Sequence, residues 1–295
     1  MTDIETDSTS EADHSKVAPT AWGVSYLRTF SDIPLTTEFF QVLEEHLRQT
    51  DEPAGAWRVK KDRLAPQLEA RYKLVDNLLR LTGAHQIIEL AAGLAPRGVN
   101  FARSNPDIQY VELDLPGVIK EKRAVIADLG IGTPPNLRIE EGDALKASDM
   151  AKAASSFSKN KPVAIVNEGL LRYLNFDEKT EVARNVHALL IEFGGAWITP
   201  DISLRSALSR EDEASGGHIQ SLAQTTGIDV SQNVFEDESH ARDFFEALGF
   251  KIERHSFLEV SDQLVSPAKL GMSPEDVKRL NEPCVAFVMT LADQA

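Results

Sequence analysis

The sequence predicts an α/β protein with a doubly wound, mostly parallel sheet, and two observations support this fold class. Beyond Gly83, short apolar runs alternate with longer segments of helical periodicity. Strands separated by crossover helices pair in parallel, with helices on both faces of the sheet. The first apolar run, 86–90, passes into the small residues Ala91, Ala92 and Gly93. Small side chains at such a turn let a ligand approach the backbone, so we expect a binding site at this edge of the sheet.

The chain before the sheet is expected to be a tail and a helical cover. Residues 1–20 carry five acids and one lysine with almost nothing apolar, a composition typical of disorder. We expect the helical cover to span 21–82. It would hold two short helices between about 22 and 50, separated by the turn residues 31–34, and a longer helix over 66–81.

The remaining residues, 83–295, are expected to form the sheet domain. Polar, glycine-containing sequence over 203–235 interrupts the alternation of strands and helices and predicts a lid insertion, and 258–283 is expected to be irregular. Strands are expected at 86–90, 109–115, 137–141, 162–167, 195–199, 250–257 and 284–291. Helices are expected at about 97–103, 117–129, 144–157, 177–192 and 238–248.

Composition narrows the class of function. The formal net charge of −15 argues against nucleic acid or an anionic membrane as a partner, because phosphates would be repelled. No apolar stretch approaches membrane-spanning length and the N-terminus has no signal-peptide pattern, so a cytoplasmic protein without a membrane partner is expected. Cys284 stands in an apolar run and is expected to be a small core residue. No His, Cys and Asp cluster has metal-ligand spacing, so no metal is expected.

Acidic side chains gather where the central strands end. Glu112 and Asp114 close the second strand, Asp143 follows the third, and Glu168 follows the fourth. Each acid on its own could simply cap the following helix. Together they would repel a diphosphate but suit a ligand with ribose hydroxyls, an adenine amino group and positive charge. S-adenosylmethionine has all of these, so the charge pattern favours it over NAD or ATP.

The turn itself also disfavours two common nucleotide sites. It lacks the complete G-x-G-x-x-G of dinucleotide enzymes and the G-x-x-x-x-G-K-[ST] of phosphate-binding loops. An oxidoreductase on the same kind of sheet is therefore disfavoured. Asp114 lies 21 residues beyond Gly93, close to the spacing of an acid that accepts hydrogen bonds from ribose hydroxyls.

Three further side chains are candidates for the chemistry. Arg71 falls on the apolar stripe of its helix, where it would either pair with a core acid or bind a ligand carboxylate bidentately. Tyr173 follows the fourth strand and is either a rim aromatic or a group whose hydroxyl orients a methyl acceptor. His218, in the predicted lid, is the best candidate for a general base.

The chain resembles the leucine carboxyl methyltransferase family of class I S-adenosylmethionine-dependent methyltransferases. Within that family it is most similar to the bacterial branch that contains the tetracenomycin polyketide O-methyltransferase. The resemblance covers roughly residues 70–201 and implies a seven-stranded sheet whose last strand is antiparallel. The matching segments, in order, are 71–72, 89–97, 110–116 with 122–123, 142–143, 168–173 and 194–201.

The resemblance also implies roles for single residues. Gly93 would be the residue of close approach to the cofactor, and Glu89 and Ala91 would flank it in the same motif. Ala91 stands where many methyltransferases have the first glycine of E-x-G-x-G. The remaining cofactor contacts implied are Asp114 for the ribose, with Glu112 on the same strand face, Asp143 and Ala144 for the adenine, and Glu168 for the amino acid end. Arg71 would hold the carboxylate of the cofactor or that of the acceptor. Tyr173 would line the transfer site.

The function predicted is an S-adenosylmethionine-dependent O-methyltransferase that acts on a carboxylate or phenolic hydroxyl of a small molecule. A carboxylate is already ionised at pH 7, whereas a phenol with a pKa of about 10 would benefit from a base such as His218. Two alternatives stay open: a non-catalytic protein that binds the cofactor, and a methyltransferase of protein C-terminal carboxylates. A homodimer is possible.

Overall fold

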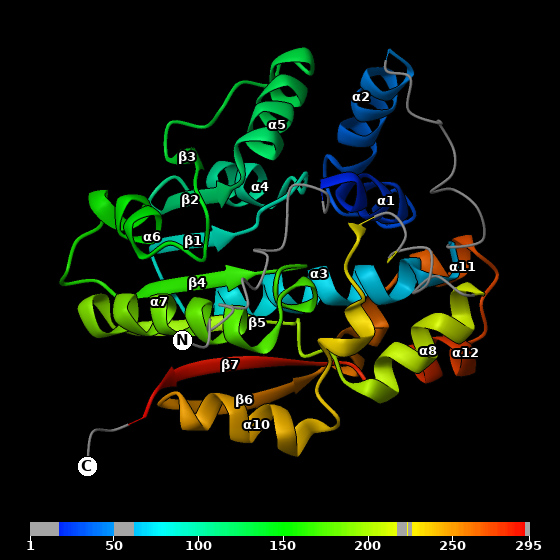
Figure 1. Cartoon of the computed structure of the whole chain (residues 1–295). Coiled ribbons are helices and arrows are strands. Elements are labelled where there is room, and N and C mark those ends of the chain that lie inside the picture. Colours follow the sequence, from blue (N-terminus) through cyan, green and yellow to red (C-terminus); the bar gives the residue numbers. More distant parts are fainter. Residues whose placement is uncertain (1–17, 50–61, 217–222, 224–225, 293–295) are drawn as a thin grey trace, which may run out of the picture.

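A computed structural model of the chain describes residues 18–49, 62–216, 223 and 226–292. Its centre is a seven-stranded sheet in the order β3-β2-β1-β4-β5-β7-β6 (Figure 1). The strands β1 to β5 pair in parallel, and β7 runs antiparallel to both β5 and β6. The predicted seven-stranded, mostly parallel sheet with an antiparallel last strand is thus confirmed. The strands are β1 Gln86–Leu90, β2 Gln109–Asp114, β3 Leu137–Glu141, β4 Val163–Asn167, β5 Gly195–Thr199, β6 Phe250–Ser256 and β7 Val285–Leu291.

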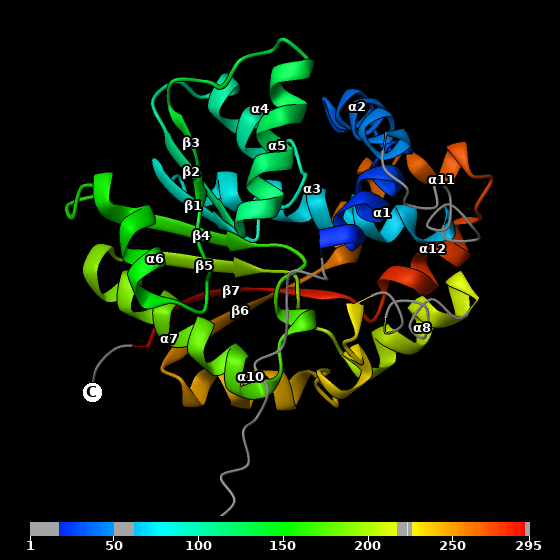
Figure 2. The same cartoon turned by 45° about the horizontal axis from the view of Figure 1, so that its top comes forward.

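Helices cover both faces of the sheet. Figure 2 shows α4 and α5 on one side, and α6, α7 and α10 on the other. This is the arrangement that right-handed crossovers produce when the strand order reverses direction between β1 and β4. The helices are α1 Ala18–Arg28, α2 Thr36–Arg48, α3 Ala65–Leu81, α4 Arg97–Ser104, α5 Pro116–Asp128, α6 Ala147–Ala153, α7 Phe176–Phe193, α8 Arg205–Ser215, α10 Glu238–Ala247, α11 Ser266–Lys269 and α12 Pro274–Asn281.

The central strands are buried on both faces, which explains their continuous apolar runs. Every residue of β1 and of β4 is buried. Side chains that face both helical layers must all be apolar or paired, so these strands show no alternation. The outer strand β6 has only one buried residue, because it pairs with β7 alone among the described strands and its other edge is left open. The sheet is therefore most rigid at β1 and β4, the two strands from which the candidate site begins.

The N-terminal helices lie at the carboxyl ends of the parallel strands. The arrowheads of β1 and β4 point toward α1, α2 and α8 in both views (Figures 1 and 2). The helix α1 packs against α2 and α3, and α2 packs against α5. The helix α1 begins at Ala18, so its first turn falls within the segment 1–20, which was predicted from composition to be disordered. Residues 1–17 lie outside the described part of the chain.

Two local expectations were wrong. The helix expected over 144–157 is shorter: α6 spans Ala147–Ala153 and a 3-10 turn follows at Ala154–Ser156. Asp143 is the reason, because its side chain accepts a hydrogen bond from the Leu145 N–H and so favours a turn over a helix. The segment 258–283 is not irregular but holds 3-10 helix, α11 and α12. Helices this short leave little periodicity in the sequence.

The predicted lid region begins and ends side by side. Leu204 and Phe235 form an isolated parallel bridge, so the insertion leaves the sheet and returns at one point. Its first part is the helix α8. Residues 217–222 and 224–225, which include the candidate base His218, lie outside the described residues. Among the helices that the structure describes, none is long and apolar enough to cross a membrane.

Candidate active site

The turn after β1 is held in place by a carboxylate of the neighbouring strand. The Gly93 N–H donates to Oδ2 of Asp114 at 2.6 Å, and the Leu115 N–H donates to Oδ1 at 2.7 Å. Burial raises the pKa of Asp114 above its usual range, while these two hydrogen bonds oppose that rise. Each carboxylate oxygen accepts one of these bonds and keeps further lone-pair capacity. The structure thus brings together Gly93 and Asp114, two residues that the sequence predicted to share a site.

Ala91 takes an unusual backbone conformation in the same turn. Its φ is +50°, in the left-handed region, and Gly93 two residues later has a φ of +55°. A side chain in this region crowds the backbone, at a cost of about 1–2 kcal/mol. By the resemblance, Ala91 stands at the first glycine of the E-x-G-x-G motif. The positive φ is the physical reason why a glycine fits this position. The chain adopts the turn in spite of Ala91.

The acids of β1 and β2 divide into buried and rim positions. Glu89 is 1% exposed and accepts hydrogen bonds from Arg97 at 2.5 Å and from the Tyr110 hydroxyl at 2.8 Å. Glu112 is fully buried, lies 2.7 Å from Nζ of Lys122, and accepts a hydrogen bond from the Gly98 N–H. Burial raises the pKa of Glu112 to about 7. Glu89 is therefore engaged by Arg97 and Tyr110, and Glu112 by Lys122 and Gly98, so neither carboxylate is proposed as a contact of the cofactor.

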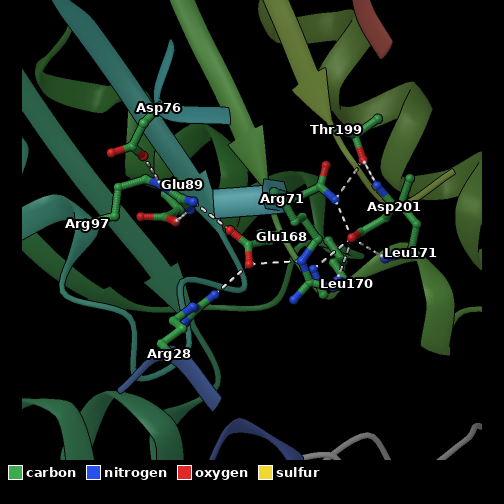
Figure 3. A network of polar contacts seen from close by, with 12 residues as sticks. Arg28, Arg71, Asp76, Glu89, Arg97, Glu168, Leu170, Leu171, Thr199 and Asp201 are labelled. Carbon is green, nitrogen blue, oxygen red and sulfur yellow. Dashed lines mark hydrogen bonds and ion pairs between the residues drawn. The ribbon is translucent and has the colours of Figure 1, made fainter. Parts of the chain in front are cut away.

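Glu168 is the centre of a buried cluster of arginines (Figure 3). Oε1 accepts hydrogen bonds from Nη2 of Arg28 at 2.5 Å and from Nε of Arg71 at 3.0 Å. Oε2 accepts one from Nη2 of Arg97 at 2.5 Å. Burial on its own would raise the pKa of Glu168, but the three guanidinium groups outweigh it and hold the pKa well below its usual range. Glu168 is therefore ionised at pH 7.

The three arginines are not equally paired. Arg97 is fully buried and also binds Glu89 and, at 2.8 Å, Asp76. Arg28 and Arg71 share the single oxygen Oε1 of Glu168. Nε of Arg28 is buried without a hydrogen-bond partner, and no hydrogen bond from the Nη atoms of Arg71 is found within the described residues. Two guanidinium groups with unused donors beside one carboxylate form a site that attracts an anion.

The remaining predicted residues lie around this centre. Asp143 follows β3 with a side chain 28% exposed, and the carbonyl of Ala144 accepts a hydrogen bond from Asn185. Tyr173 is mostly buried, and its hydroxyl donates to Oγ1 of Thr20 on α1 at 3.2 Å. Of the described residues, no group of three or more His, Cys, Asp or Glu side chains is arranged to hold a metal ion.

Sequence reasoning missed three residues of the site. Arg28 comes from the N-terminal cover and carries no pattern that links it to the sheet. Arg97 and Asp201 stood inside recognised motifs, but their roles depend on side chains far away in the chain. Asp201 accepts hydrogen bonds from Asn167 and from the backbone N–H groups of Gly169, Leu170 and Leu171. The signal that could have identified Arg97 is its place in the sequence, because it is a charged residue that closely follows the small-residue turn.

Comparison with known proteins identifies the family. The family model described as leucine carboxyl methyltransferase matches residues 13–187, more than half of the chain. The chain belongs to the leucine carboxyl methyltransferase family. The arginine and carboxylate cluster and the turn through Gly93 both lie within the matched residues.

Individual relatives agree with this assignment. A putative S-adenosyl-L-methionine-dependent methyltransferase of Mycobacterium sp. (strain JLS) is 24% identical over 245 residues, which cover 82% of this chain and 79% of that protein. A protein of the same description from Mycobacterium marinum is 36% identical over 92 residues, 31% of this chain and 28% of that protein. The prediction of a methyltransferase that uses S-adenosylmethionine is confirmed at this level.

A solved structure supports the fold. The crystal structure of a DUF574 family protein from Streptomyces avermitilis aligns with a TM-score of 0.54 and 12% sequence identity, over 92% of this chain and 97% of that one. At this identity the similarity bears on the arrangement of strands and helices alone. It covers a larger share of the chain than the family model does.

Replacing Ala91 by glycine should relieve the strained turn. We expect Ala91→Gly to leave stability unchanged or raise it by up to ~1 kcal/mol, because glycine adopts a positive φ without a steric penalty. Urea denaturation measures the difference. A destabilisation of more than ~1 kcal/mol in Ala91→Gly would contradict the strain.

The charge on Glu168 should make stability fall steeply in acid. Its pKa is lowered in the folded state, so its contribution is complete above the unfolded pKa of about 4.3 and is lost as the pH falls below that value. The loss is up to ~1.4 kcal/mol per pH unit for one such group. Glu168→Gln should be destabilised at pH 7 by ~3–5 kcal/mol, because Arg28 and Arg71 lose the carboxylate they share and Arg97 loses one of its carboxylate partners. Its stability should also fall less between pH 5 and 3.5 than that of the unchanged protein, as followed by urea denaturation. Equal slopes would rule out this charge as the cause.

Proposed function

We propose that the protein is an O-methyltransferase that transfers the methyl group of S-adenosylmethionine to a carboxylate or phenolic hydroxyl of a small molecule. The observation that carries the proposal is the charge distribution at the carboxyl ends of β1 and β4. Unused donors of Arg28 and Arg71 lie beside Glu168, and Asp114 and Asp143 lie at the ends of the next strands. This distribution is complementary to a nucleoside with a zwitterionic amino acid end.

The residues present fit this cofactor. The orphaned Nε of Arg28 and the free donors of Arg71 would bind its carboxylate, and Glu168 would lie near its ammonium group. Asp114 would accept hydrogen bonds from the ribose hydroxyls, since each of its oxygens retains a lone pair. Gly93 would lie against the cofactor. The partly exposed Asp143, with Ala144 beside it, would face the adenine.

The chemistry requires little from the protein beyond orientation. When bound, the cofactor supplies a methyl group attached to a positively charged sulfur that is a good leaving group. The protein must align the acceptor oxygen with that group and exclude competing water. Arg28 and Arg71 beside the single carboxylate of Glu168 leave that end of the site with a net positive charge, which the carboxylate of the bound cofactor would offset.

The acceptor side is proposed to lie at Tyr173. Its ring packs with Val230 and with the partly buried Leu208 and Ile228, which together offer an apolar wall for an organic acid or phenol. Its hydroxyl donates to Thr20 and could equally donate to an acceptor oxygen. A carboxylate acceptor needs no base at pH 7. A phenolic acceptor would need one, and His218 remains the candidate from the sequence.

One alternative acceptor has an observation in its favour. The description of the matching family names the carboxyl group of leucine. A protein C-terminal carboxylate would use the same site, because its chemistry is that of any other carboxylate. Labelled-methyl transfer to a panel of small aromatic acids, phenols and C-terminal leucine peptides separates the two acceptors. Transfer to none of them, with tight cofactor binding, would indicate a binding protein without activity.

Arg71 should matter for the amino acid end of the cofactor alone. We compare S-adenosylhomocysteine with 5′-methylthioadenosine, which has the same nucleoside but lacks the amino acid. Arg71→Met should weaken S-adenosylhomocysteine at least tenfold, about 1.4 kcal/mol, and methylthioadenosine less than twofold, by isothermal titration calorimetry. Arg184→Met, at an exposed arginine on α7, is the control. No binding of S-adenosylhomocysteine to the unchanged protein, or binding of NAD, would overturn the proposed function.

Tyr173 should affect transfer more than cofactor binding. Tyr173→Phe removes the hydroxyl and keeps the ring, so the apolar wall remains. We expect kcat for labelled-methyl transfer to fall about tenfold or more, the loss of one oriented hydrogen bond, while the Kd for S-adenosylhomocysteine changes less than twofold. An unchanged kcat would place the acceptor elsewhere.

A further inference from the structure

Asp201 is a buried carboxylate that holds the turn after the neighbouring strand. It follows β5, is 3% exposed, and reaches across to the end of β4. Oδ1 accepts a hydrogen bond from the Gly169 N–H at 2.9 Å. Oδ2 accepts hydrogen bonds from the N–H groups of Leu170 at 2.7 Å and Leu171 at 3.1 Å. Three consecutive backbone N–H groups therefore converge on one side chain.

A fourth hydrogen bond ties this carboxylate to the sheet. Nδ2 of Asn167, the last residue of β4, donates to Oδ2 of Asp201 at 2.7 Å and to Oγ1 of Thr199 at 3.0 Å. Oδ1 of Asn167 accepts from the indole N–H of Trp197 at 2.7 Å. The position of Asp201 is thus fixed by two adjacent strands, and the turn is fixed by Asp201 (Figure 3).

The turn carries both ends of the proposed reaction site. Glu168, which faces the arginines, immediately precedes Gly169, and Tyr173 ends the 3-10 helix that begins at Leu171. Gly169 has a φ of +86°, a conformation that other residues rarely adopt. A change in the direction of these N–H groups would rotate the backbone next to Glu168. The carboxylate therefore controls where Glu168 and Tyr173 lie relative to each other.

We propose that Asp201 is a positioning residue for methyl transfer, acting through the turn 168–173 on the amino acid end of the cofactor and on the acceptor. This inference rests on the proposed function. An acid is required at this position because both oxygens accept hydrogen bonds from N–H groups. An amide offers one acceptor oxygen and would turn its NH₂ group toward an N–H donor, which leaves that donor buried and unpaired.

The test compares the same two ligands in the full chain. In Asp201→Asn, one oxygen can keep the hydrogen bonds of Oδ2 while the NH₂ group faces the Gly169 N–H. We expect the Kd for S-adenosylhomocysteine to rise at least tenfold and the Kd for 5′-methylthioadenosine to change less than twofold. The kcat for labelled-methyl transfer should fall by a similar factor at saturating cofactor, since Tyr173 moves with the turn.

A matched control separates positioning from stability. Glu69 is likewise a buried carboxylate that accepts backbone N–H bonds, from Val265 and Ser266, but it lies away from the turn. Glu69→Gln should lower the melting temperature and leave both Kd values within twofold.

Gly169→Ala is the second variant, should Asp201→Asn fail to fold. Its Cβ would meet no atom within 4 Å, so the change acts on the backbone of the turn alone. It should show the same selective loss.

The outcomes distinguish this inference from the proposed function. Equal weakening of both ligands in Asp201→Asn and in Gly169→Ala would mean that Asp201 supports the fold only, and would overturn the inference. Unchanged binding of S-adenosylhomocysteine and unchanged kcat in both variants would overturn it as well, with the proposed function intact. If the unchanged protein binds neither ligand, the proposed function itself fails, and the inference fails with it.

Discussion

The buried cluster around Glu168 is the interaction on which the rest of the site depends. Its three arginines come from α1, from α3 and from the start of α4, so one carboxylate joins two helices of the N-terminal cover to the first helix of the sheet domain. Removing one partner from such a cluster leaves a buried charge, at a cost of ~3–5 kcal/mol. The cover is therefore attached to the sheet at the site itself. The same cluster leaves donors of Arg28 and Arg71 unused, and these are the donors that the proposed function assigns to the carboxylate of the cofactor.

The two turns that border the site are held in the same way. Asp114, at the end of β2, accepts the Gly93 N–H of the turn after β1. Asp201, beyond the end of β5, accepts three N–H groups of the turn after β4. In the strand order β2-β1-β4-β5, the two inner strands lead into turns that the outer strands fix. Buried N–H groups require acceptors, and a carboxylate satisfies several of them at once without secondary structure. The two turns are thus held by hydrogen bonds within the protein itself.

The acids of the site could be predicted as a group but not one by one. Their positions at strand ends follow from the alternation of apolar runs and helices, and this was correct for Asp114, Asp143 and Glu168. Glu112 shares a face of β2 with Asp114, yet it is buried against Lys122. A period of two tells which face a side chain lies on, but how deep it lies depends on the helices packed above it. Arg71 illustrates the same limit, because both alternatives, an acid partner and a ligand, remain compatible with one position on a helix.

The sequence by itself determined the fold class, the positions of the apolar strands along the chain, the family, and the small-residue turn after β1. These are local properties, since the spacing of apolar residues and the size of turn residues act over a few positions. Only the tertiary structure decided which charges meet. Arg28 and Glu168 are 140 residues apart in sequence, and Asp201 is about 30 residues from the N–H groups it accepts. Such pairs form because burial forbids an unpaired charge or N–H group, a condition that exists only once the elements have packed together.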